Sequence, residues 1–418
     1  MKNRCLAFAA LLAASLPVHA VYAQGFLPPQ DRALAAISAY AEVRAANADV
    51  EQARARAGAL EAGPHETQLT LAPLRRRVGD GGAGGIGNAY YNEWEVELAR
   101  PIRLPGKAEL DRKSGTHGTK AAELRQGDAE HQAARTLLTR WMDWLRAAAA
   151  AQTARERQDS LAREQAALTR RVKLGDAAQR ELDQMNAALA SAEAEWRTGE
   201  AEVLACRLAL TVGFPQIPVP AHAPVLPEPA PLDGTAQSWM DRIVDRSHEI
   251  GALEETAAQH DTLARRASAD RRPDPTIGLR TFSERGGMER GVGVVLTIPF
   301  GGDRRNAEAR AEAAVADVAR SQAEAMRRDI TLAANLAVTR AQAAIDLWHA
   351  AHAARAANAA SLAKQRRAHE LGEIGLTERL QAERLDAESA LAELRARADA
   401  HEAKLRVLID SHELWHQE

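Results

Sequence analysis

Apolar side chains recur at every second position in four short segments of the chain. In residues 292–298 the large apolar residues fall on one side of a strand, and the smaller or polar residues fall on the other. The apolar side consists of Val292, Val294, Leu296 and Ile298. The same alternation occurs in three other segments, 67–71, 93–98 and 277–282. The pattern predicts four β-strands in two hairpins, each with one apolar face.

The first predicted hairpin has an acidic face opposite its apolar one. Glu93, Glu95 and Glu97 alternate with apolar residues, and a glycine-rich stretch at 79–85 forms the hairpin tip. A soluble sheet has the same pattern. Here, however, each strand is close to the 9–11 residues that cross a bilayer, and aromatic residues gather at one end of the hairpin. They are Tyr90, Tyr91 and Trp94.

Long segments rich in Ala, Arg and Glu separate the hairpins. Residues 303–371 contain no proline, which at 1.5 Å per residue predicts a helix of roughly 100 Å. Its larger apolar residues form two stripes, one with Val318, Leu332, Leu336 and Leu347 and one with Ile330, Val338 and Ile345. Two stripes imply neighbours on both sides, as in the wall of a tube. Other helices are predicted at 28–62, 111–172, 179–210 and 235–269.

The whole order of elements occurs twice. Leu98–Ile102 matches Leu296–Phe300, and Leu174-Gly175-Asp176 matches Leu371-Gly372-Glu373 at nearly the same offset. The glycines of the second pair of matches interrupt the helical pattern, so we expect a turn and an antiparallel helix pair at each. We therefore divide the mature chain into two helix–hairpin–helix repeats joined by a proline-rich connector. The boundaries are 24–213, 214–232 and 233–418.

Residues 1–23 have the features of a secretory signal peptide, with basic residues, an apolar run and small residues before the cleavage position. Charged residues make up 27% of the chain and the formal net charge is −3, so the balance does not indicate a nucleic-acid partner. Cys206 is the only cysteine outside the predicted signal, which excludes an internal disulfide in the mature chain. No apolar run of about 18 residues follows the signal. A membrane-spanning form of this protein would use its strands.

Four strands are too few to close a barrel. An open sheet in a bilayer leaves edge N–H and C=O groups without partners, and the smallest closed barrels have eight strands. Two copies would make a barrel of eight filled by its own side chains, whereas three would make one of twelve with room for a conduit. We therefore expect a homotrimer in contact with outer-membrane lipid. The predicted fold is mainly α with a small β part: long helical hairpins form a periplasmic tunnel below a shared twelve-stranded barrel.

The sequence resembles the TolC-like outer-membrane efflux channel family over nearly the whole mature chain. The resemblance rests on the two strand-to-helix corners at 100–107 and 297–302, the glycine turns, the duplication and the connector. It implies a trimeric outer-membrane channel whose periplasmic tips meet an adaptor protein and an inner-membrane pump. The Leu-Pro-Gly-Lys of the first corner, 104–107, looks most like the metal-cation efflux branch.

Three sets of residues follow as functional candidates, and none of them implies a cofactor. The helix tips Leu174, Gly175, Leu371 and Gly372 are expected to contact the adaptor, and the alternative is a purely structural turn. Glu93, Glu95 and Glu97 are expected to face the barrel lumen, where three copies would favour cations. The resemblance also implies an acidic residue facing the pore axis six positions after the second tip glycine. That residue is Glu378, and the alternative is an exposed glutamate that favours the helix dipole.

Two groups of residues match patterns found in metal sites, but neither is predicted to bind a metal. His412-Glu413-Leu414-Trp415-His416 matches the H-E-x-x-H pattern, which on a helix places two imidazoles on one face for zinc, but too little chain follows to supply a third ligand. Asp346, His349 and His352 share a helical face, and we interpret them as a solvated polar stripe. No metal ligand is predicted.

The leading hypothesis is a passive outer-membrane exit duct of a tripartite efflux or type I secretion system. No phosphate-binding loop or nucleophile–base arrangement is recognisable, so we do not expect an enzyme. The alternative is a periplasmic coiled-coil adaptor of the same kind of machine. An adaptor typically has one central helical hairpin, whereas here the order helix–strand–strand–helix occurs twice.

Overall fold

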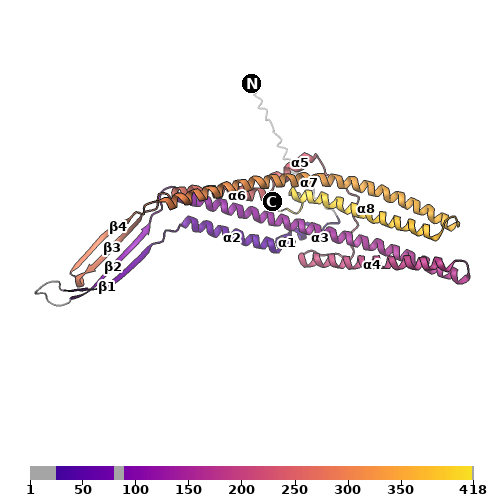
Figure 1. The fold of residues 1–418 in the computed structure, drawn as a ribbon, viewed down its shortest axis with the longest axis horizontal. Helices are drawn as coiled ribbons and strands as arrows, with labels where there is room; N and C mark the ends of the chain where they lie inside the picture. Colours follow the sequence, from indigo (N-terminus) through magenta and orange to yellow (C-terminus); the bar gives the residue numbers. More distant parts are fainter. Residues whose placement is uncertain (1–24, 80–88, 417–418) are drawn as a thin grey trace, which may run out of the picture.

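The chain folds into an elongated body with a β-sheet at one end and two helical hairpin tips at the other (Figure 1). This computed structural model describes residues 25–79 and 89–416. The predicted signal peptide, 1–23, and most of the predicted glycine-rich tip lie outside the described residues.

Each half of the chain has the same order of elements. The first half contains α1 (Gln30–Ser38), α2 (Ala41–Ala62), β1 (Gln68–Val78), β2 (Ala89–Pro101), α3 (Lys107–Leu174) and α4 (Gln179–Gly213). The second half contains α5 (Ala236–Asp245), α6 (His248–Ala269), β3 (Thr276–Glu284), the short helix η1 (Arg285–Gly287), β4 (Glu289–Thr297), α7 (Asp303–Glu370) and α8 (Leu376–Asp410). The corresponding long helices are equal in length, 68 residues for α3 and α7 and 35 for α4 and α8.

The longest helices are continuous, as predicted, but the helix before each hairpin is not. The predicted helix at 28–62 is broken between α1 and α2, and the one at 235–269 is broken between α5 and α6. Both predictions of a single helix are wrong. At the second break, Ser247 has an extended backbone and its hydroxyl accepts a hydrogen bond from the Ile250 amide at 3.2 Å, so it caps the start of α6.

The four strands form one antiparallel sheet in the order β1-β2-β3-β4. The central pairing, β2 with β3, joins the two halves of the chain, and Leu98 lies opposite Leu279 in it. Within the described residues, the outer edges of β1 and β4 have no partner strand. The chain therefore presents two open sheet edges.

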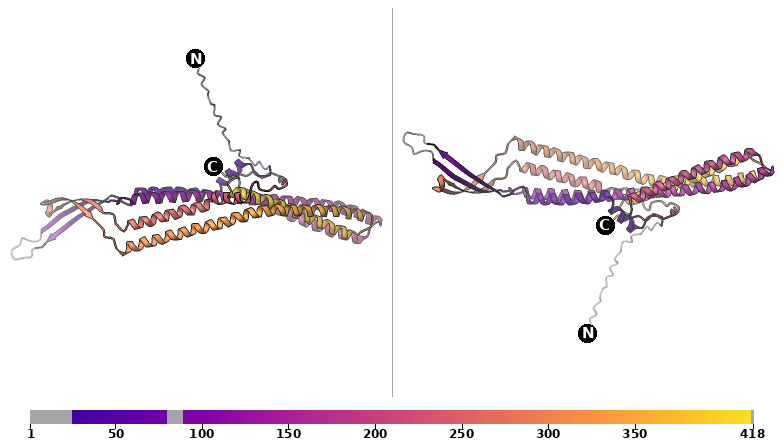
Figure 2. Two further views of the ribbon diagram at one scale, coloured as in Figure 1. Left: turned by 90° about the horizontal axis from the view of Figure 1, so that it is seen from above. Right: turned by 90° about the horizontal axis from the view of Figure 1, so that it is seen from below.

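The helices pack as antiparallel pairs around a core near the middle of the body. α3 lies against α4 and α7 against α8, while α2 and α6 extend the bundle toward the sheet (Figure 1). The core includes Trp141, Trp144, Phe214 and Val338, all almost completely buried. α1, the connector and the C-terminal segment gather on one side of the body at this level (Figure 2).

The non-helical connector, 214–232, lies along α8. Arg397 Nη1 donates to the Leu226 carbonyl at 3.2 Å, and Lys404 Nζ donates to the Pro231 carbonyl at 2.9 Å. His401 Nε2 forms a hydrogen bond with the Pro227 carbonyl oxygen at 2.9 Å. The prolines of the connector have no amide hydrogen, so this segment does not form the backbone hydrogen bonds of a helix. Side chains of α8 donate to its carbonyl oxygens instead.

The two predicted stripes of α7 have different surroundings. Val338 and Ile345 are buried within the chain, at 0% and 8% exposure. Leu332 and Leu347, of the other stripe, are each 60% exposed. One side of α7 thus packs inside the chain, and its other apolar side has no covering element in the described parts, 25–79 and 89–416.

A charged network joins the sheet to the helices. Lys107, the first residue of α3, is 2% exposed, and its Nζ lies 2.9 Å from both Asp270 Oδ1 and Asp274 Oδ1 and 2.7 Å from the Arg272 carbonyl. Asp274 also accepts from the Leu104 amide at 2.9 Å and lies 2.9 Å from His65 Nε2. The Leu-Pro-Gly-Lys corner therefore ties the first half of the chain to the segment that leads into β3.

Candidate functional site

One face of the sheet is apolar and open. Leu69, Leu98, Leu279 and Val294 are successive cross-strand partners, so their side chains form a row across all four strands. Each is more than half exposed, from 51% for Leu98 to 73% for Val294. None of the helices in the described chain has both the length and the apolarity of a membrane-spanning helix. Contiguous exposed apolar surface of this kind is a binding surface for lipid or protein.

The opposite face of the sheet carries the three predicted glutamates, and arginines neutralise two of them. Arg76 Nη2 lies 2.7 Å from Glu93 Oε1, and Arg280 Nη2 lies 2.7 Å from Glu95 Oε2. Glu97 forms no ion pair with any residue in 25–79 or 89–416. Of the three predicted glutamates, Glu97 therefore keeps an unpaired charge on this face within the described residues.

The two predicted tips are equivalent turns at the end of the body farthest from the sheet (Figure 1). Gly175 has φ 81° and Gly372 has φ 78°, a region that side chains other than glycine rarely adopt. The Gly175 and Asp176 amides donate to carbonyls near the end of α3 at 3.1 and 2.8 Å, and the corresponding bonds at Gly372 and Glu373 are 3.0 and 2.9 Å. The turn is a structural requirement at both places.

Each tip also exposes an apolar side chain beside its glycine. Leu174 is 76% exposed and Leu371 is 57% exposed. A helix end does not require leucine at this position, so the pair forms an accessible apolar feature at the tips.

Glu378 lies in the first turn of α8, close to the second tip. Its Oε2 accepts a hydrogen bond from the Gly375 amide at 3.2 Å. This bond satisfies one of the free amides at the start of the helix, and the carboxylate is favourably placed relative to the helix dipole. The side chain remains exposed at the tip end of the body.

The H-E-x-x-H string is not helical, which removes the geometry of a helical zinc protease. α8 ends at Asp410, and His412 and Trp415 have φ values of 60° and 52°. The chain therefore folds back after α8. Trp415 is 5% exposed and anchors this segment in the core.

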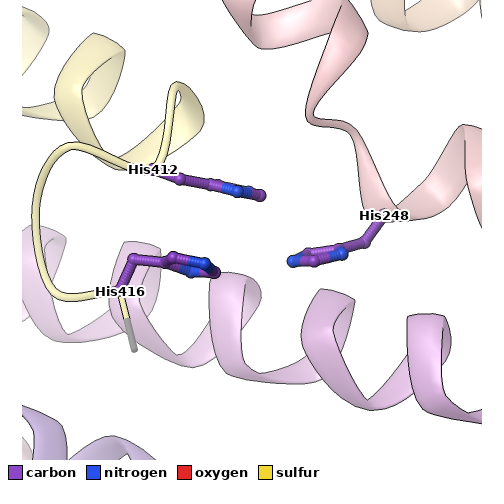
Figure 3. Close-up of side chains that lie close together, drawn as sticks. All are labelled: His248, His412 and His416. Carbon is purple, nitrogen blue, oxygen red and sulfur yellow. The ribbon is translucent and has the colours of Figure 1, made fainter. Parts of the chain in front are cut away.

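Folding brings a third histidine to the string. His248, the first residue of α6, faces His412 and His416 from the opposite side (Figure 3). The ring centroids of His412 and His416 are 4.3 Å apart, and those of His248 and His412 are 4.7 Å apart. One ring nitrogen from each of the three residues lies within 4.8 Å of the others.

The surroundings of His412 and His248 favour the neutral form of their rings. Burial and the neighbouring His416 and His248 rings lower the pKa of His412 to about 3. Burial, together with His416, also lowers the pKa of His248. A neutral imidazole keeps one nitrogen lone pair, so these rings are able to act as ligands.

Sequence reasoning missed this cluster because His248 lies far from the other two in the chain. Within 25–79 and 89–416, Asp346, His349 and His352 do not form a cluster with the spacing of metal ligands. His349 and His352 lie against the Trp348 ring, with centroids at 4.7 and 5.6 Å, and His352 Nδ1 is 3.7 Å from Glu393 Oε1.

Comparison with solved structures agrees on the fold. CusC, a protein whose structures concern transmembrane channel formation, superposes with a TM-score of 0.77 over 91% of each chain at 15% identity. The chain has the fold of an outer-membrane channel. The Campylobacter jejuni CmeC outer membrane channel gives a TM-score of 0.72 over 93% of this chain and 86% of its own at 15% identity. The open state of the Neisseria gonorrhoeae MtrE outer membrane channel gives 0.68 over 92% and 88% at 17% identity.

At these identities the likeness concerns the fold. Comparison of the sequence with protein-family models and with curated proteins finds no match. The similarity nevertheless extends over more than nine-tenths of the chain in each case.

Proposed function

We propose that this protein is the outer-membrane exit duct of a tripartite efflux or type I secretion system, and that it conducts substrates passively from an inner-membrane pump. The observation that carries the proposal is the sheet, which has one exposed apolar face and one charged face. Such a sheet is suited to a barrel wall with lipid outside and water inside. The fold of outer-membrane channels supports the same function.

The open edges of β1 and β4 support a trimer. Edge amides and carbonyls have no water to bind inside a bilayer, so β1 of one copy must pair with β4 of the next until the ring closes. Three copies supply twelve strands and leave a lumen, whereas two supply eight and leave none.

The exposed stripe of α7 fits the same assembly. Val318, Leu332 and Leu347 are between 56% and 60% exposed in a single chain. Against a neighbouring copy they would be buried and would complete the wall of a helical tunnel in the periplasm. The sheet end would then lie in the outer membrane and the tips would point toward the pump.

The tips are proposed to dock a periplasmic adaptor. Leu174 and Leu371 are exposed beside equivalent glycine turns, and three copies would present six such turns in a ring. Glu378 is proposed to line the constriction at this end. Of the three predicted glutamates, Glu97 is the one proposed to contribute an unpaired charge to the barrel lumen.

No observation favours the adaptor alternative. The two hairpins of the chain pair through β2 and β3 into one sheet, and each half has its own long helix pair. The choice of substrate depends mainly on the pump, so the duct is compatible with metal ions, drugs or polypeptides. The Leu-Pro-Gly-Lys sequence of the first corner suggests a metal cation.

Membrane fractionation followed by sizing of the detergent-solubilised protein tests the proposal. We expect the protein in the outer-membrane fraction and a protein mass of three chains after subtraction of detergent. A monomer in the soluble periplasmic fraction would contradict the proposed function.

A further inference from the structure

The turn that ends α8 has the same form as the turns that end α3 and α7, but a different residue type at one position. The His412 amide donates to the Ile409 carbonyl at 2.9 Å and the Glu413 amide donates to the Leu408 carbonyl at 2.8 Å. This is the hydrogen-bond pattern of the turns at Gly175 and Gly372. The left-handed position, which is glycine in both of those turns, is histidine here, with φ 60°.

A histidine in this conformation is strained relative to glycine, and strained positions of this kind cluster at functional sites. The turn places the His412 ring against that of His248. The two rings are stacked, with 24° between their planes. His412 Nε2 is buried and has no hydrogen-bond partner in the described structure. A buried nitrogen of this kind is a place where a ligand or ion is expected.

The position of His248, the first residue of α6, depends on a glycine in α3. Gly127 lies inside α3, where glycine is less favourable than alanine. A Cβ at this position would lie 2.8 Å from both Cε1 and Nε2 of His248. Gly127 therefore makes the space in which the His248 ring lies beside the other two.

The C-terminal segment that carries the other two rings is fixed from both sides. Trp415 is buried in the core, and Arg246 Nη1 donates to the Ser411 carbonyl at 2.6 Å. Glu413 pairs with two arginines of the second half of the chain, at 3.4 Å from Arg242 and 3.2 Å from Arg246. The cluster is thus a set of three imidazoles on a fixed backbone.

We propose that His248, His412 and His416 bind one divalent transition-metal ion of the Zn²⁺ class, which fastens the C-terminal segment to the start of α6. Imidazole is a favoured ligand for Zn²⁺, Ni²⁺ and Cu²⁺, and three histidines with a water molecule complete a tetrahedral site. Tetrahedral Zn–N bonds place nitrogens about 3.3 Å apart. The three nitrogens here lie within 4.8 Å of one another, and rotation about the two side-chain torsions of each histidine covers the difference.

The site is distinct from the proposed duct surfaces. It lies midway along the body, away from both the sheet and the tips (Figures 1 and 2). Export and metal binding are therefore separable properties, and loss of one does not decide the other.

The test uses the full mature protein in detergent, purified through an N-terminal tag without histidines. After removal of metal with a chelator, Zn²⁺ is titrated in competition with a coloured chelator, and bound metal is counted by mass spectrometry. We expect one Zn²⁺ per chain. Loss of a group that merely orients a ligand weakens metal binding about 10–100-fold, so loss of a ligand should weaken it at least about 100-fold.

Two variants make the result independent of folding. His412→Gly removes a ligand and installs the residue that the turn prefers, so the trimer should remain intact while Zn²⁺ affinity falls. His416→Ala removes a different proposed ligand and should have the same effect on affinity. His349→Ala, at an exposed histidine outside the cluster, is the control and should bind as the parent does.

A second measurement follows the fastening itself. Zn²⁺ should raise the thermal unfolding midpoint of the parent and of His349→Ala, but leave that of His412→Gly unchanged. Equal Zn²⁺ affinity of the parent and His412→Gly, or no stoichiometric binding by the parent, would overturn the proposal.

Discussion

Removal of the Lys107 ammonium should destabilise the junction between the sheet and the helices. The side chain is 2% exposed, and its Nζ contacts two carboxylates and a backbone carbonyl within 2.9 Å. In Lys107→Met the methylene stem remains and the charge is lost. Asp274, whose side chain is 10% exposed, then keeps a buried negative charge without its main cation.

The expected cost follows from the burial of this pair. Removing one partner of a buried ion pair costs about 3–5 kcal/mol, because the other charge stays desolvated. Asp274 keeps its hydrogen bond from the Leu104 amide, and Asp270 is 38% exposed and keeps its ion pair with Arg266. We therefore expect a loss near the lower limit, about 3 kcal/mol per chain.

Thermal unfolding of the detergent-solubilised protein, followed by far-ultraviolet circular dichroism at one fixed scan rate, is the appropriate assay. The matched control is Lys113→Met in the same helix, whose side chain is 59% exposed and pairs with Glu109 at 3.4 Å. An exposed pair of this kind contributes about 0.3–0.5 kcal/mol. The double variant Lys107→Met/Asp274→Asn should be more stable than Lys107→Met alone, because it removes the uncompensated charge.

Two outcomes would refute this reasoning. Equal midpoints for Lys107→Met and Lys113→Met would mean that the buried pair contributes no more than an exposed one. A double variant less stable than Lys107→Met would mean that the charge on Asp274 is not the source of the loss.

Three further predictions concern the tips and the middle of the body. Gly175→Val or Gly372→Val should strain a turn with φ near +80° and reduce export while trimers persist. The control Gly375→Ala, at φ −80°, should leave export unchanged. Export and adaptor cross-linking are the measurements, and unchanged values for the valine variants would count against docking of an adaptor at the tips. Glu378→Gln should reduce cation preference and block by multivalent cations in planar bilayers with little change in thermal stability, and equal selectivity would place Glu378 outside the constriction. Burial would raise the pKa of Glu393, but hydrogen bonds from Trp348 and Arg397 outweigh it and lower that pKa below its ordinary value of 4.5. Its stabilising effect is therefore complete above about pH 4.5 and is lost as pH falls toward the lowered pKa, so the unfolding midpoint should fall less on acidification in Glu393→Gln than in the parent, and an identical pH dependence would contradict this.

The periodic parts of the fold could be predicted from the sequence because their signals are local. The alternation in 292–298 fixes one face of β4, and glycine at 175 and 372 fixes left-handed turns that few other residues form. The breaks before α2 and α6 were missed, although Ser247 is a recognisable helix cap.

The functional surfaces were predictable only in part. Alternation indicates that Glu93 and Glu95 share a face, but the register that brings Arg76 and Arg280 to them depends on strand pairing. The histidine cluster depends on two facts that no local pattern contains. These are the return of the chain after α8 and the packing of α6 beside it.

Cross-linking of the two open sheet edges tests the central claim most directly. Within one chain β1 and β4 are separated by two strands, about 14 Å at the usual strand spacing, whereas a disulfide needs Cα atoms within about 7 Å. In a Cys206→Ser background, Thr70→Cys is combined in turn with Gly293→Cys, Val295→Cys or Thr297→Cys, which lie on the same face of the sheet. Each single substitution serves as a control.

The account predicts that at least one of these pairs oxidises to a covalent ring of three chains, resolved on a non-reducing gel and converted to monomers by reductant. The single-cysteine controls should remain monomeric. Absence of inter-chain cross-links at all three positions, or a product series that stops at two chains or continues beyond three, would contradict a trimeric barrel shared between copies.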